Sequence, residues 1–96
     1  MKKQIGRRQL RLLGQRIRAI RLARGFSQEE LASRSEIHAT YLSSVECGKR
    51  NPSLMILFSI AHGLSVPPGA LFQFDGVEKS SKYDDSEIRP NKKWQR

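Results

Sequence analysis

The sequence has little of what metal centres, disulfide-stabilised folds and membrane proteins depend on. Its single cysteine, Cys47, cannot form an internal disulfide, so a reducing compartment, the cytoplasm, is expected. The two histidines, His38 and His62, lie far apart, and no spacing typical of metal ligands occurs. No apolar run approaches membrane-spanning length, and neither a catalytic constellation nor a glycine-rich phosphate loop is present. We therefore expect no enzymatic activity, no cofactor or metal, and no membrane or small-molecule partner.

Acidic side chains are scarce at one end of the chain. The net charge is +9 and the pI is about 10.5. Residues 1–25 hold nine basic and no acidic side chains, whereas residues 26–74 hold three basic and four acidic ones. The positive field therefore originates at the N-terminal end. A balance of this kind favours a polyanionic partner.

A chain of 96 residues suits one domain. Its apolar side chains are spaced mostly as in helices. Apolar side chains recur in the amphipathic pattern at Leu10, Leu13, Ile17 and Ile20, which predicts a helix over residues 10–24 that ends at Gly25. Residues 1–9 are predicted to be a basic arm, either disordered or able to reach along a polyanionic partner. Residues 75–96 are polar and mixed in charge, which predicts a flexible tail.

Two short helices joined by a tight turn are predicted between residues 25 and 48. Ser27 is a natural N-cap, and Glu30 lies where its carboxylate completes a capping box. In the second helix Leu42 and Val45 share one face with the upstream Ile37. The other residues of this helix are small or polar, and they are Ala39, Thr40, Ser43 and Ser44. A helix with so narrow an apolar face suits contact with a polar partner.

These residues resemble the Xre/Cro-type helix-turn-helix of phage repressors. The resemblance runs from about Leu13 to Phe72 and rests on SQEELA at 27–32, YLSSVE at 41–46 and GKRNPSL at 48–54. The same segment is similar to the controller proteins of restriction-modification systems. The resemblance implies an all-α, compact five-helix fold like the lambda repressor domain over residues 10–74, with an arm before it and a tail after it.

The resemblance also implies how DNA would be bound. The helix over residues 39–47 would enter the major groove, Gln28 would bond a phosphate at the start of the preceding helix, and Lys49 and Arg50 would clamp a phosphate. Tyr41 would contact DNA or pack on helix 28–35. The candidate DNA-binding residues are Gln28, His38, Ala39, Thr40, Tyr41, Ser43, Ser44, Lys49 and Arg50.

Two structural features follow from the same resemblance. Arg21 and Glu46 occupy the positions of an ion pair that ties the first helix to the third, and it is expected to orient the helices more than to stabilise them. Glu36 stands where such units commonly carry glycine in a left-handed turn. Glutamate in that conformation is expected to cost on the order of 1 kcal/mol.

The C-terminal part of the domain is predicted to carry a dimer contact. A helix from Leu54 to about Gly63 would bury Leu54, Leu57, Ile60, Ala61 and Leu64, and a short fifth helix would follow Val66. Met55 and Ile56 would either lie under the tail or form an interface. The dimer candidates are Met55, Ile56, Leu64, Val66, Leu71, Phe72 and Phe74.

The sequence thus favours a dimeric, sequence-specific regulator of transcription that binds double-stranded DNA at an inverted repeat. Controller, phage-type and plasmid-type repressors all fit this description. An antitoxin that binds its partner through residues 75–96, or a protein-interaction module that has lost DNA binding, is the alternative.

Overall fold

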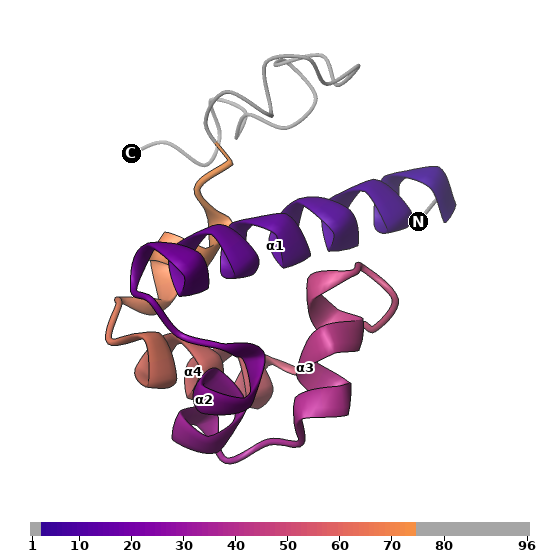
Figure 1. The fold of residues 1–96 in the computed structure, drawn as a ribbon. Helices are drawn as coiled ribbons and strands as arrows, with labels where there is room; N and C mark the ends of the chain where they lie inside the picture. The colour runs from indigo at the N-terminus through magenta and orange to yellow at the C-terminus, as the bar shows by residue number, and fades with distance from the viewer. Residues whose placement is uncertain (1–2, 75–96) are drawn as a thin grey trace, which may run out of the picture.

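The structure, a computed structural model, describes residues 3–74, which form four α-helices and one 3₁₀ helix without any strand (Figure 1). In chain order these are α1 (Lys3–Ala23), α2 (Gln28–Ser35), α3 (Ala39–Glu46), α4 (Leu54–Leu64) and η1 (Pro68–Phe72). The expected all-α fold is confirmed, and the predicted tail lies outside the described residues. Of the helices within residues 3–74, none combines the length and the apolar character that a membrane crossing requires.

The last element differs from the expected fifth α-helix. It is a 3₁₀ helix of 5 residues, in which the Ala70 N–H donates to the Pro67 carbonyl over 2.9 Å. Pro67 and Pro68 have no N–H to donate, and so short a segment gains little from α-helical bonds. The domain is therefore a four-helix body closed by a single tight turn.

The basic N-terminal segment is helical, so the alternative of a disordered arm is wrong for residues 3–9. Lys, Gln and Arg, which dominate there, are good helix formers, and only Gly6 interrupts them. Leu12 is buried and Leu10 is half-buried, so packing also favours the longer helix. Figure 1 shows α1 lying across one side of the body, with its N-terminal end extending past α3.

One apolar core joins all five elements. Its members are Leu13, Ile17, Ile20, Leu31, Ala32, Leu42, Val45, Leu57, Ile60, Ala61, Leu64 and Leu71. The predicted stripe on α1 is confirmed by the burial of its last three residues. The prediction for Leu54 is wrong, because its side chain is 62% exposed. Leu54 is the first residue of α4, and it remains outside the core that the later turns of this helix join.

Local capping sets the ends of α2 as the sequence predicts. The Glu30 N–H donates to Ser27 Oγ over 3.0 Å, and the Ser27 N–H donates to Glu30 Oε1 over 2.7 Å. At the other end Glu36 has φ 59° and ψ 43°, the left-handed conformation expected for this position. The Ile37 N–H then donates to the Ala32 carbonyl over 3.0 Å, which closes the turn into α3. The turn between the two helices is thus fixed by backbone bonds.

A glycine on α1 sets how closely this helix crosses α3. A Cβ at Gly14 would lie 2.4 Å from the Val45 carbonyl oxygen and 2.5 Å from that of Glu46. Such distances are closer than real Cβ contacts, so only glycine fits without a shift of one helix. The C-terminal end of α3 is therefore held directly against the backbone of α1.

Candidate nucleic-acid interface

α3 separates its buried and its exposed side chains on different faces. Leu42 is 0% exposed and Val45 is 1% exposed, and both belong to the core. Thr40 is exposed, whereas Ser43 and Ser44 are half-buried. Leu42 and Val45 lie three residues apart and share one face of the helix. Thr40, Ser43 and Ser44 therefore turn away from the core. The polar face of α3 is therefore open to a partner, as the sequence predicts.

The N-terminal end of α3 carries side chains that are small or that make no capping bond. His38 precedes the helix and is exposed, and its side chain makes no capping bond. Ala39 is half-buried and packs against the core. Ser44 Oγ donates to the Thr40 carbonyl over 3.2 Å. Since the Ser44 hydroxyl already has a partner within the helix, Thr40 and His38 are the more available side chains at this end.

Tyr41 and Arg50 form a stacked pair beside α3. The Tyr41 ring is half-buried against the core. The Arg50 guanidinium carbon lies 5.7 Å from the centre of that ring. Stacking of this kind restricts a long side chain while its charge stays in solvent. Lys49 is exposed next to it, so two cationic groups follow the C-terminal end of α3.

The predicted ion pair is present and buried. Arg21 Nε donates to Glu46 Oε2 over 2.7 Å, and Arg21 Nη2 donates to Glu46 Oε1 over 3.1 Å. The two side chains are 7% and 2% exposed. Arg21 Nη1 also donates to the Phe26 carbonyl over 2.9 Å. This two-pronged pair joins the last residue of α3 to α1 and to the loop before α2.

Gln28, a candidate phosphate-binding residue, also makes a bond within the protein. Its side-chain Nε2 donates to Glu46 Oε1 over 2.9 Å, so it braces the last residue of α3. The Glu46 carboxylate is buried at the start of α2, where it accepts one of the two N–H groups of the Gln28 amide. Residues of α1 and α2 thus both bond to the carboxylate of Glu46, the last residue of α3.

Two of the predicted dimer residues belong to the core of the single chain. Leu64 and Leu71 are each 0% exposed, so the structure corrects their assignment to an interface. Three others, Ile56, Val66 and Phe74, are half-buried against the core. Met55 and Phe72 remain exposed, at 69% and 51%. Two further apolar side chains on α4 that the sequence reasoning did not assign to an interface, Leu54 and Phe58, are also exposed.

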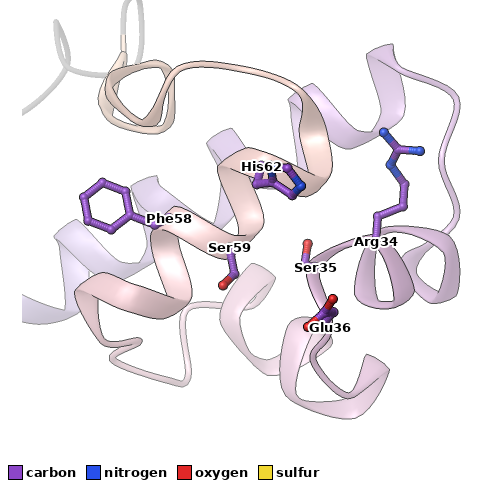
Figure 2. A pocket seen from close by; sticks show the side chains of 6 residues that line it. All are labelled: Arg34, Ser35, Glu36, Phe58, Ser59 and His62. Carbon is purple, nitrogen blue, oxygen red and sulfur yellow. The ribbon is translucent and has the colours of Figure 1, made fainter.

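A hollow of about 250 Å³ lies between the end of α2 and α4, and Figure 2 shows the side chains around it. They are Arg34, Ser35, Glu36, Phe58, Ser59 and His62. Arg34 Nε is already bonded to the Gly63 carbonyl over 2.7 Å. None of the lining residues belongs to α3, so the hollow is part of the seam between α2 and α4 and not of the polar face described above.

Comparison with known proteins finds a helix-turn-helix family match and related regulators. The helix-turn-helix (HTH_3) family model matches residues 17–71. The control protein C.BamHI of Bacillus amyloliquefaciens is 44% identical over 67 residues, which cover 69% of this chain and 83% of that protein. The immunity repressor protein of Bacillus phage phi105 is 32% identical over 77 residues, covering 78% of this chain and 54% of the repressor.

A solved structure agrees with these relatives. The restriction-modification controller protein C.AhdI from Aeromonas hydrophila superposes with a TM-score of 0.65 at 43% identity, covering 66% of this chain and 96% of that one. Family match, sequence identity and fold are consistent with the outward polar face of α3. The chain belongs to the Xre-type helix-turn-helix (HTH_3) family and is a DNA-binding regulator of transcription.

Proposed function

We propose that the protein binds an inverted-repeat operator as a homodimer and controls a restriction-modification operon. The observation that carries the DNA-binding mode is the polar face of α3, open at Thr40 and braced at Glu46 by α1 and α2. The similarity to C.BamHI and C.AhdI, both named as controller proteins, supports the choice of operon. Because the ligand is operator DNA, this role belongs to the cytoplasm.

The N-terminal part of α3 enters the major groove, and Thr40 reaches the base edges there. Its hydroxyl can bond a base, and its methyl group can contact the methyl group of thymine. Lys49 and Arg50 bind phosphates at the edge of the groove and so set the register of the helix. Short side chains give little bidentate discrimination between bases. The shape and deformability of the operator therefore supply much of the specificity.

The second copy docks on the apolar surface of α4. Leu54, Met55 and Phe58 are 62%, 69% and 43% exposed on this helix, and Phe72 of η1 is 51% exposed. Contiguous apolar side chains on a surface mark a site of association. One recognition helix covers only half of an inverted repeat, and a two-fold dimer places two of them about 34 Å apart.

In vitro selection from a random pool of duplexes tests the proposal. The protein should enrich an inverted repeat, and its affinity for that sequence should fall steeply as salt is added. Thr40→Ala should change the enriched sequence more than the affinity for unrelated DNA. Ser33→Ala, which alters an exposed residue on α2, is the matched control and should change neither.

Three outcomes would contradict the proposal. The first is a pool without any enriched sequence. The second is an equal loss of affinity for all duplexes in Thr40→Ala, which would remove that residue from base readout. The third is a Met55→Lys variant that sediments at the same mass as the parent protein, because a lysine in the proposed interface should separate the subunits.

A further inference from the structure

The N-terminal half of α1 extends beyond the region that the family model matches. The family model begins at residue 17, whereas α1 begins at Lys3. Residues 3–16 therefore add about four helical turns before the matched region. Part of this addition is used for packing, because Leu13 and Gly14 contact the rest of the body. The charges of Arg7 and Arg11 are not explained by packing, because both residues are exposed.

Three exposed arginines form a basic stripe along α1, which consists of Arg7, Arg11 and Arg18. Their spacings of four and seven residues place them on one face of the helix. Within residues 3–74 none of the three has a hydrogen bond or an ion pair, and no acidic residue precedes Glu29. Like charges four residues apart on a helix repel each other, so the stripe weakens the isolated helix slightly.

Arg16 of α1 and Arg24, the residue that follows α1, show what structural arginines do in this fold. Arg16 Nε donates to the Ala70 carbonyl over 2.8 Å, and Arg24 Nη2 donates to the Ser65 carbonyl over 3.3 Å. Both side chains thus hold α1 to the segment around η1, on another side of the helix from the basic stripe. The contrast separates arginines that stabilise the body from arginines that have no partner within it.

The basic stripe lies beside the cationic end of the proposed interface. A Cβ at Gly48 would lie 2.9 Å from Arg11 Cγ and 3.0 Å from Arg11 Cα, so α1 rests directly on the turn that leads to Lys49 and Arg50. Gly14, which faces the end of α3, lies between Arg11 and Arg18 in the sequence and adjoins the stripe on the helix surface. In Figure 1 the N-terminal end of α1 projects past α3.

We infer that the basic stripe is a second phosphate-binding surface, which contacts the DNA backbone beyond the base pairs that α3 reads. The inference rests on the DNA-binding mode proposed above. A duplex offers a continuous row of phosphates, and a row of unpaired arginines next to Lys49 and Arg50 matches it in charge and in extension. Phosphate contacts carry no sequence information, so the stripe adds affinity and salt dependence without altering the preferred sequence.

The test compares two double variants on two lengths of duplex. Arg7→Gln/Arg11→Gln removes two charges from the stripe and keeps good helix formers in place. Arg16→Gln/Arg24→Gln removes the same charge from another side of α1 and from the residue that follows it, and is the matched control. The duplexes are the selected operator alone and the operator with several flanking base pairs on each side. Thermal unfolding is recorded for both variants to establish that they are folded.

On the longer duplex the parent protein should show a steeper fall of affinity with salt than the stripe variant. The difference in slope should be about 0.9 for each phosphate that the variant no longer neutralises. On the short duplex the two proteins should differ much less, and the sequence enriched by selection should be the same. The control variant should keep the slope of the parent, apart from the effect of its lower net charge.

A stripe variant whose slope matches that of the control on the longer duplex would overturn the inference while leaving the role of α3 intact. A change in the enriched sequence would also overturn it, because a phosphate-binding surface does not read bases. Failure of the parent protein to enrich any duplex is a separate result, and it would count against the proposed function itself.

Discussion

The buried pair of Arg21 and Glu46 allows the coupling among α1, α2 and α3 to be measured. Replacing Arg21 with methionine leaves a carboxylate that is 2% exposed and that has, within residues 3–74, only the Gln28 amide as a hydrogen-bond partner. Removing one member of a buried ion pair costs about 3–5 kcal/mol, because the remaining charge is desolvated without compensation. A small domain is stable by only about 5–15 kcal/mol, so Arg21→Met should lose a large share of the free energy of unfolding.

The reverse change should have a similar effect, and the double change should not. Glu46→Met leaves the Arg21 guanidinium with the Phe26 carbonyl as its hydrogen-bond partner among the described residues. In Arg21→Met/Glu46→Met no buried charge remains, and apolar side chains of similar length fill the same space. The double variant should therefore regain most of the lost stability, to within about 1–2 kcal/mol of the parent.

Urea denaturation followed by circular dichroism gives the free energies for this double-mutant cycle. The expected coupling energy is about 4–9 kcal/mol, because the two single losses together exceed the loss in the double variant by that amount. Single variants that each lose less than about 1 kcal/mol would show a pair no stronger than an exposed one. A double variant that loses the sum of both single effects would show that the two side chains stabilise the protein independently. Either result would refute the reasoning.

Three further substitutions test other parts of the fold. Gly14→Ala should lower the free energy of unfolding by about 1–3 kcal/mol, because the new Cβ would lie 2.4 Å from the Val45 carbonyl oxygen. Helix propensity alone predicts a gain in stability, and such a gain would contradict the close crossing of α1 and α3. Glu36→Gly should raise the melting temperature by roughly 4–8 °C, because it removes the cost of about 1 kcal/mol that glutamate incurs in the left-handed conformation. An unchanged melting temperature would show that the turn is not strained. Ser27→Ala should cost about 1 kcal/mol by urea denaturation, because it removes one half of the capping box; a loss below a few tenths would mean that the box adds little.

Features set by short-range chemistry were predictable from the sequence. Ser27 and Glu30 satisfy each other's backbone groups within four residues, so their motif is visible without knowledge of the fold. The exposure of Thr40 follows from the spacing of Leu42 and Val45. The ion pair spans 25 residues, and it could be placed only because the sequence resembles a family with a known arrangement.

Features set by long-range packing were not predictable. Leu64 and Leu71 are apolar in the same way as Met55, and the sequence does not say which of them the chain itself covers. Basic composition over residues 1–9 indicated an arm, although the same residues are good helix formers that extend a helix already anchored by its later turns. The need for glycine at position 14 depends on the approach of another backbone, which no local pattern records.

The most direct test of the recognition surface is to map which backbone amides change when the selected duplex is added to ¹⁵N-labelled protein. The largest chemical-shift changes should fall on residues 39–44 of α3 and on Lys49 and Arg50, because these lie at the proposed surface of contact. The amides around Phe58 on α4 should change little at a protein concentration where the dimer is already formed. Changes centred on α4, with the signals of α3 left in place, would contradict the account.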